Sequence, residues 1–287
     1  MNMKQLIYIL VLFVVASATA NDYVKDAEPA ILEVHYTRTE YHDSTDHSKV
    51  HFSDPVTLRI GKTKSAFFGT KRLWKDSLVV VNPDVYWAME MENMNKAMET
   101  GEKKDLASGY YWSYIYKNTP EGKVIERCYF DMERWQYTED WEKPKWEIGN
   151  STKTILGYEC VEATANYRGR RWTAWFAPEI PIQEGPWKLC GLPGLILMAQ
   201  DANVDYIFEA DGLIQNPDSE VGIFTYDDKR GFTTVTRDKF FNNWWKYKNS
   251  KFAAKMKAAF GVRGNTPTEE RKPVMHDKEE RNYPHDL

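Results

Sequence analysis

The sequence has little of what most often reveals a function. Its 287 residues include three cysteines, and no G-x-S-x-G, H-E-x-x-H, P-loop or Rossmann fingerprint is present. After the first twenty residues, no apolar run is long enough to span a bilayer. The formal charge of -4 is unremarkable. We therefore predict no catalytic residue, no metal ligand and no cofactor, and the sequence alone indicates compartment and architecture rather than a reaction.

Aromatic residues, by contrast, are abundant. The chain contains 11 Trp, 17 Tyr and 13 Phe, together 14% of all residues, and such residues favour β-strands over helices. With 42% hydrophobic and 28% charged residues, the chain has enough apolar surface to fold, which excludes a wholly disordered protein. We expect a β-rich globular protein.

The first twenty residues have the order of a secretory signal peptide. Lys4 supplies the positive charge, residues 6–15 form the apolar region, and Ala18-Thr19-Ala20 is a small-residue cleavage site. The apolar region is too short for a spanning helix, and no cysteine follows the cleavage site for lipid attachment. We expect a mature chain that starts at Asn21, has no transmembrane segment, and is periplasmic or otherwise exported, in possible association with an outer membrane.

The cysteines are an odd set, Cys128, Cys160 and Cys190. Disulfides persist outside the cytoplasm, so we predict a bridge between Cys160 and Cys190 and a free Cys128. The bridge would close a loop of about 30 residues and stabilise the fold by about 3 kcal/mol. The alternatives are three small buried thiols or, less favoured, a catalytic thiol, since no histidine stands near a cysteine in a known motif.

Alternating apolar residues predict strands along most of the chain. The pattern occurs at residues 32–37, 112–116, 172–176 and 204–208, and turn residues at 167–170 and 201–203 predict two antiparallel hairpins. Two segments instead have helical signals, at residues 84–100 and 237–260. Residues 263–287 are charged and almost free of apolar side chains, which predicts a mobile tail after a single domain at 21–262.

The most informative segment is residues 175–201. Leu192-Pro193-Gly194-Leu195 predicts a type II turn, in which Gly194 would take a positive φ. Residues 195–199 that follow are apolar on both alternating sets, so this strand must be covered on both faces. Either a helix or a bound apolar ligand would provide the second cover.

This segment resembles a known family. Residues 185–197 read Gly-Pro-Trp-Lys-Leu-Cys-Gly-Leu-Pro-Gly-Leu-Ile-Leu and contain the motif of the GLPGLI family of exported bacterial proteins. Residues 157–160, 169–176 and 179–181 also match, and the resemblance extends over about residues 30–210. It implies export and a shared fold, but no reaction. More distantly, the strand order resembles that of periplasmic lipoprotein carriers (LolA-like), whose open half-barrel holds acyl chains.

From these observations we expect a mainly β fold, a curved antiparallel sheet or half-barrel of roughly eight to eleven strands with one or two covering helices. The expected function is non-catalytic binding or carriage of an apolar or amphipathic ligand, such as a lipid or lipidated protein. The alternative is a structural or assembly partner of an outer-membrane complex, and a metal-binding or thiol enzyme is a weaker third. The residues expected to line the ligand site are Trp172, Trp175, Trp187, Leu195, Leu197 and Trp244.

Three further clusters have ordinary explanations that we prefer. His35, His42, His47 and His51 match no zinc spacing and are read as a polar loop rather than a metal site. Methionines at 89, 91, 94 and 98, together with Trp87, suggest an adaptable apolar stripe on a lid helix rather than a copper site. The basic and aromatic residues of 237–260 are read as a docked helix, with membrane-surface contact as the alternative, and export argues against nucleic acid.

Overall fold

The fold is known from a computed structural model, which describes residues 23–41, 50, 52–101, 109, 111–130, 133–226, 231–249 and 278–282. The described residues contain fourteen strands and three helices. The strands are β1 (Val24–Pro29), β2 (Leu32–Glu40), β3 (Phe52–Ile60), β4 (Ser65–Gly69), β5 (Ser113–Lys117), β6 (Lys123–Phe130), β7 (Glu133–Asp140), β8 (Glu147–Ile155), β9 (Tyr158–Tyr167), β10 (Arg170–Ala177), β11 (Leu195–Asp201), β12 (Tyr206–Gln215), β13 (Glu220–Phe224) and β14 (Thr233–Thr234). The helices are α2 (Thr70–Val81), α3 (Pro83–Thr100) and α4 (Arg237–Asn249).

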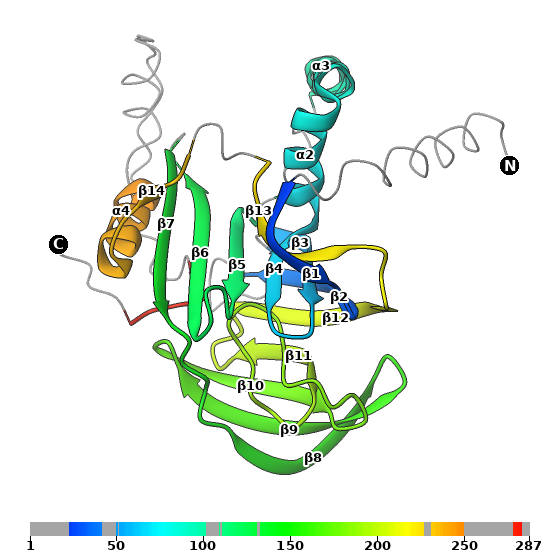
Figure 1. Cartoon of the computed structure of the whole chain (residues 1–287), viewed down its shortest axis with the longest axis vertical. Helices are drawn as coiled ribbons and strands as arrows, with labels where there is room; N and C mark the ends of the chain where they lie inside the picture. Colours follow the sequence, from blue (N-terminus) through cyan, green and yellow to red (C-terminus); the bar gives the residue numbers. More distant parts are fainter. Residues whose placement is uncertain are drawn as a thin grey trace, which may run out of the picture.

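Twelve strands form one sheet in the order β14-β7-β6-β5-β4-β3-β2-β12-β11-β10-β9-β8. All its pairings are antiparallel except the short β14–β7 pair at one edge, and β1 and β13 form a separate two-stranded sheet. The large sheet bends strongly, so that β8–β11 run crosswise to β5–β7, and it does not close (Figure 1). The expectation of a mainly β, curved and open antiparallel sheet is confirmed, with more strands than expected.

The two predicted hairpins are also confirmed. The β9–β10 turn places Arg168 and Gly169 at φ 52° and 78°, and Tyr167 pairs with Arg170. Positive φ at both central residues is what a two-residue hairpin turn requires. The second hairpin joins β11 to β12, with Asp201 Oδ1 accepting a hydrogen bond from the backbone N–H of Tyr206 at 2.9 Å.

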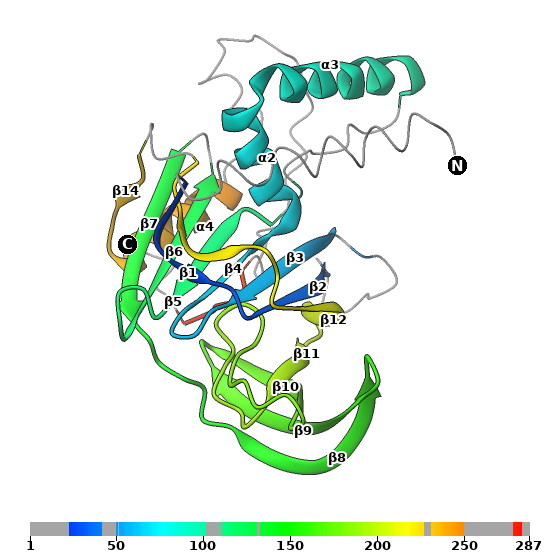
Figure 2. The same ribbon diagram turned by 45° about the vertical axis from the view of Figure 1, so that its right-hand side comes forward.

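The helices differ from the prediction in number and position. Helix α3 begins and ends where expected: Asn82 accepts a hydrogen bond from Val85 N, and Gly101 ends the helix at φ 68°. Helix α4 starts as predicted at Arg237, while its expected continuation after Asn249 lies outside the described residues. Helix α2 was not predicted. It rises from the sheet, and α3 extends from its far end away from the sheet instead of covering it (Figure 2). None of the described helices is both long and apolar enough to cross a membrane.

The strand after the Pro-Gly bend lies inside the sheet, as predicted. Leu195, Ile196 and Leu197 of β11 are fully buried. Part of the cover is the preceding segment: Leu195 N donates to the carbonyl of Ile180, and Ile196 N to that of Glu184. Strand β11 is therefore held by its own connecting loop.

The turn that leads into β11 is not the predicted type II turn. Gly194 has no positive φ; the left-handed residue is Gly191, at φ 89°. Glycine is needed at 194 for another reason, because a Cβ there would lie 2.3 Å from the carbonyl oxygen of Ala177. Pattern alone could not distinguish a conformational glycine from one that permits close backbone approach.

The first three described residues of the expected mobile tail are buried. Residues 278–282, with the sequence Lys-Glu-Glu-Arg-Asn, lie against the sheet and are called the KEERN segment below (red in Figure 1). Lys278, Glu279 and Glu280 are 6%, 2% and 1% exposed. The expectation of mobility was wrong for these residues because their charges find partners that no local pattern reveals. The rest of residues 263–287 lies outside the described residues.

Candidate functional site

The residues expected to line a ligand site are packed in the protein core. Trp172, Trp187, Leu195 and Leu197 are at most 1% exposed and belong to one cluster, in which the rings of Trp172 and Trp187 are 5.5 Å apart. Trp175 packs at the edge of this cluster. Trp244 belongs to a separate cluster, where α4 meets Tyr137 of β7. The structure thus brings five of the six residues together in one packed cluster.

The predicted disulfide is absent. Cys128, Cys160 and Cys190 are all free and buried. Cys160 lies on β9 beside Ile155 and Lys153, whereas Cys190 lies in the loop before β11 beside Lys117 and Glu184. The loop-entropy argument considered only their separation in sequence, and the fold places them among different neighbours.

Burial also makes these thiols poor nucleophiles. It raises the pKa of Cys128 and Cys160, and it raises the pKa of Cys190 to about 11. A reactive cysteine requires the opposite shift, towards thiolate at neutral pH. This observation weighs against the thiol-enzyme alternative.

The predicted histidine cluster is only partly described. His35 Nε2 lies 2.8 Å from Glu33 Oε1, and His42, His47 and His51 lie outside the described residues. Among the residues that the structure does describe, no group of three or more His, Cys, Asp or Glu side chains is arranged to hold a metal ion.

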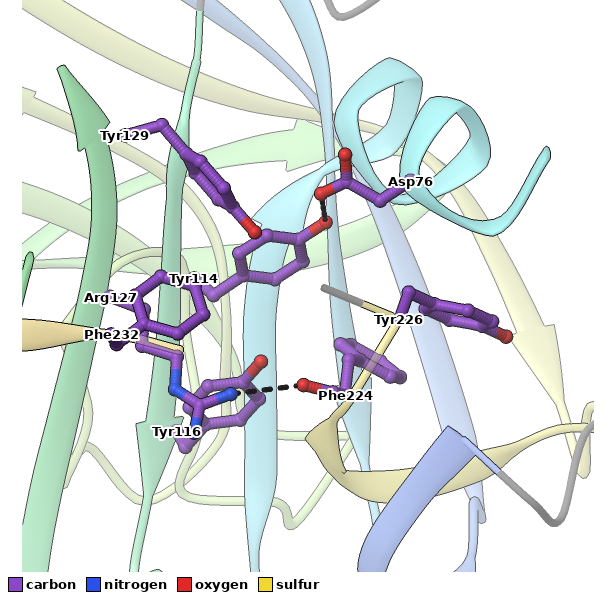
Figure 3. A pocket seen from close by; sticks show the side chains of 8 residues that line it. All are labelled: Asp76, Tyr114, Tyr116, Arg127, Tyr129, Phe224, Tyr226 and Phe232. Carbon is purple, nitrogen blue, oxygen red and sulfur yellow. Dashed lines mark hydrogen bonds between the residues drawn. The ribbon is translucent and has the colours of Figure 1, made fainter. Parts of the chain in front are cut away.

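A pocket lined mainly by aromatic rings lies on one face of β5 and β6 (Figure 3). It encloses about 200 Å³, part of which is open solvent. Alternate residues of β5 and β6 point to this face, and the strand β13 and its continuation complete the wall. The lining residues are Asp76, Tyr114, Tyr116, Arg127, Tyr129, Phe224, Tyr226 and Phe232.

Two polar groups fix the shape of this pocket. Tyr114 donates a hydrogen bond from its hydroxyl to Asp76 Oδ2 at 2.8 Å, which ties β5 to α2 (Figure 3). Arg127 donates to the carbonyl of Phe224 at 3.0 Å and lies 4.6 Å from the ring centre of Phe232. Ligand pockets for drug-sized molecules usually enclose roughly 300–1,000 Å³. The space here is smaller and includes open solvent, so the pocket has no room for a drug-sized ligand.

Helix α3 presents an apolar stripe to solvent. Trp87, Met91, Met94 and Met98 follow one another at spacings of four, three and four residues, which places them on one side of the helix. Trp87, Met91 and Met98 are 60%, 52% and 73% exposed. We call these four residues the α3 stripe. The base of α3 is fixed to α2, since Tyr86 is buried with its ring 6.0 Å from Lys75 Nζ.

A network of buried charges surrounds the KEERN segment. Its centre is Lys188 of the loop before β11, whose ammonium donates to Tyr137 Oη at 2.6 Å, to Glu139 Oε1 at 2.8 Å and to Glu280. The carboxylate of Glu126 lies 3.1 Å from the same nitrogen. A lysine with these partners stays charged although it is fully buried.

The pKa values in this network favour the charged forms. Burial alone would lower the pKa of Lys188, but the carboxylates of Glu280, Glu126 and Glu139 raise it well above its ordinary value. Burial would likewise raise the pKa of Glu126, but the ammonium groups of Lys278 and Lys188 lower it. The charges are therefore mutually stabilised rather than poised for proton transfer at neutral pH.

Sequence reasoning missed the charged residues of this network. Lys188 was treated only as part of the Pro-Gly motif, although a lysine between Trp187 and Leu189 in an apolar run is a signal for a buried, paired charge. The pocket residues Phe224, Tyr226 and Phe232 carried no such signal, because single aromatic residues after a strand are ordinary core candidates. The predictions covered Tyr114 and Tyr116 as strand residues, but not their role in a pocket.

The comparisons with known proteins add a family resemblance over one part of the chain. Residues 166–198, which run from the end of β9 into β11 and include the GLPGLI motif, match the family described as "Protein of unknown function (Porph_ging)". No curated protein matches the chain. The match supports the GLPGLI resemblance for this segment and provides no activity.

Similar solved structures include two of PNGF-II, one in space group P21 and one in C2. Each is 14% identical to this chain, covers 76% of it, and gives TM-scores of 0.46 and 0.44 respectively. The chain spans only about a third of the length of these proteins, with 33% of each covered. Similarity at this level carries no argument about activity.

Proposed function

We propose that this chain is an exported protein of the cell envelope that binds another protein through the α3 stripe. The observation that carries the proposal is the exposure of Trp87, Met91 and Met98 on one side of a helix that stands away from the sheet (Figure 2). Exposed apolar patches of this kind mark interaction surfaces, and helix-to-helix docking uses apolar anchors at such spacings.

The charge of α3 indicates the kind of partner. The helix carries Asp84, Glu90, Glu92 and Glu99 against a single base, Lys96. A second copy of this helix would be repelled, so the partner that fits is an amphipathic helix with an apolar stripe flanked by lysine or arginine. Methionine suits this contact because its flexible side chain adapts to the shape of its neighbour.

Carriage of a lipid, the first expectation from the sequence, has less support. An acyl chain needs an apolar cavity, and the residues expected to line one pack against each other, with Trp172 and Trp187 fully buried. The aromatic pocket is too small for an acyl chain. Protein binding through the exposed α3 stripe is thus the better explanation.

The test places a photoreactive amino acid at Met91 or, as the matched control, at Met89. Both are exposed methionines of α3, and two residues apart on a helix they point about 160° away from each other. Illumination in the native envelope should give an adduct from position 91 and little or none from position 89. The attached peptide, identified by mass spectrometry, should be an amphipathic helix with basic flanks, and Trp87→Glu should remove the adduct.

Three outcomes would contradict the proposal. Equal adducts from both positions would indicate non-specific contact, and an adduct of twice the chain mass would indicate self-association. Stoichiometric lipid in organic extracts of the native protein, without an adduct, would favour the carrier function instead. Export itself is tested separately by sequencing the N-terminus of the mature protein, which should begin at Asn21.

A further inference from the structure

The KEERN segment is held like a bound peptide. Each of its first four side chains pairs with a group of opposite charge or with a hydrogen-bonding group. Lys278 Nζ donates to Glu126 Oε1 at 3.0 Å and to Ser113 Oγ at 3.1 Å. Glu279 accepts from Arg38 Nε at 2.9 Å. Glu280 accepts from Lys188 and Arg237, and Arg281 donates to Asp205 Oδ2 at 2.5 Å.

The backbone of the segment is held as well. Arg170 Nη2 donates to the carbonyl of Lys278 at 2.9 Å, and the N–H of Arg281 donates to the carbonyl of Arg168 at 2.8 Å. Arg237 closes the far end with a 2.7 Å hydrogen bond to Asn282 Oδ1. Peptide-binding sites commonly combine such backbone contacts, which hold any chain, with side-chain contacts that select a sequence.

The groove around the segment is balanced in charge without it. Ten buried or half-buried side chains contact the segment or one another, five cationic and five anionic: Arg38, Arg168, Arg170, Lys188 and Arg237, with Glu40, Glu126, Glu139, Asp201 and Asp205. The exposed Glu142 and Asp238 also lie near Arg168 and Arg237. The segment itself carries two charges of each sign. Departure of the segment therefore leaves no net charge among the buried and half-buried groups of the groove, unlike removal of a single ion-pair partner.

The connection to the rest of the fold is long. The last described residue of helix α4 is Asn249, and residues 250–277 lie in sequence between it and Lys278. The bonded partners lie far away in sequence, since Arg38 and Glu279 are 241 positions apart. Within the described residues, the segment is held in the groove by its own side-chain and backbone hydrogen bonds.

We propose that this groove is a recognition site for a peptide with the charge pattern Lys-Glu-Glu-Arg, and that residues 278–282 are its displaceable occupant within the same chain. The groove would accept the same pattern from another polypeptide when the KEERN segment leaves. This site is separate from the α3 stripe and does not depend on the function proposed for it.

The test uses the full chain with a protease site introduced after Gly264. After folding and cleavage, a fluorescent peptide of residues 275–287 is added in excess, and its anisotropy is followed. The labelled peptide should replace the released fragment at one per protein, while uncleaved protein, whose own segment competes at high effective concentration, should bind it at least tenfold more weakly. A peptide with Glu280→Lys should bind at least a hundredfold more weakly, because it places a cation beside Lys188 and Arg237.

A groove variant provides the reciprocal readout. Arg38→Met removes the partner of Glu279, so it should weaken the unmodified peptide at least tenfold but have much less effect on a peptide with Glu279→Met. Circular dichroism of the cleaved variant confirms that the sheet stays folded. If the labelled peptide does not replace the cleaved fragment over days, the KEERN segment is a permanent part of the core, and the proposal is overturned. Equal binding of the Glu280→Lys peptide, or no binding after the fragment leaves, would overturn it too.

Discussion

Lys188 shows how one residue of the GLPGLI segment connects distant parts of the molecule. Its ammonium lies among Glu126 and Glu139 of neighbouring strands and Glu280 of the KEERN segment. The Pro-Gly part of the motif shapes the loop, and the lysine anchors that loop to β6 and β7. A role in holding the fold together is sufficient to explain why this side chain is charged and buried.

Substitution of Lys188 by methionine should destabilise the protein strongly. Lys188→Met keeps the length of the side chain but leaves carboxylates without their shared cation, and such a loss typically costs about 3–5 kcal/mol. The free energy of unfolding, from urea titration followed by tryptophan fluorescence, should fall by an amount in this range. The control Lys123→Met removes an exposed pair with Asp140 and should change it little. Equal effects of the two substitutions would show that burial of Lys188 is not important.

The cysteines provide a second test at the residue scale. Because all three are free, denatured and unreduced protein should react with three equivalents of a thiol reagent. The native protein should react slowly, since all three thiols are buried and burial raises the pKa of Cys190 to about 11. Alkylation followed by mass spectrometry gives the count. A single reactive thiol under denaturing conditions would restore the Cys160–Cys190 disulfide.

At the scale of elements, strand β11 depends on the close approach of its preceding turn to β10. Gly194→Ala would place a Cβ 2.3 Å from the carbonyl oxygen of Ala177, in a backbone region that cannot easily move, and should destabilise by about 1–3 kcal/mol or more. The matched control is Gly149→Ala on the edge strand β8, where the new Cβ would make an ordinary contact at 3.5 Å. The urea midpoint of unfolding should fall for Gly194→Ala and stay nearly unchanged for Gly149→Ala. An unchanged midpoint for Gly194→Ala would contradict the close packing.

Elements with local signals were the ones that sequence could predict. The alternation of β2 and β10, and the Asn82 and Gly101 boundaries of α3, depend on neighbouring residues and were identified correctly. Helix α2 was missed because Gly69 offers no side-chain cap and Val79, Val80 and Val81 favour strands. Tertiary contact with β3 and β4 must outweigh these local preferences.

The candidate sites were less predictable than the strands. The stripe of α3 was predicted from its methionines, although Met89 lies on another side of the helix. Its exposure was not predicted, because helical periodicity does not say whether a face meets the sheet or the solvent. Apart from Lys188 in its apolar run, the residues of the charged groove had no recognisable pattern in the sequence. Several of its ion pairs join residues far apart in sequence: Arg38 and Glu279 are 241 positions apart, and Lys188 and Glu280 are 92 positions apart. Only the folded topology brings these partners together.

For the molecule as a whole, the buried charges predict acid sensitivity. The ammonium groups of Lys278 and Lys188 outweigh the effect of burial on Glu126, and Lys188 and Arg237 do the same for Glu280, so the pKa of both carboxyls lies below the usual 4.5. Their contribution to stability is then present above about pH 4.5 and is lost as the pH falls through the lower folded values. The urea midpoint should be nearly constant from pH 7 to 5 and fall progressively below that.

The variant Glu126→Gln tests the source of this dependence. It should be less stable than the wild type at pH 7, because Lys188 and Lys278 lose a partner, yet its midpoint should fall less on acidification. Parallel curves for the two proteins would mean that other groups cause the acid loss. A wild-type midpoint unchanged down to pH 3 would contradict lowered pKa values at both carboxyls.

The distance in sequence between Arg38 and Glu279 also has a consequence for biosynthesis. A ribosome adds about 5–20 residues per second, so roughly 10 to 50 seconds separate the appearance of these two partners, which are 241 positions apart. Throughout that interval the nascent polypeptide cannot complete its inner ion pairs. A protein proposed to be threaded through a secretion pore before folding gains from such a delay, because premature closure would block its passage.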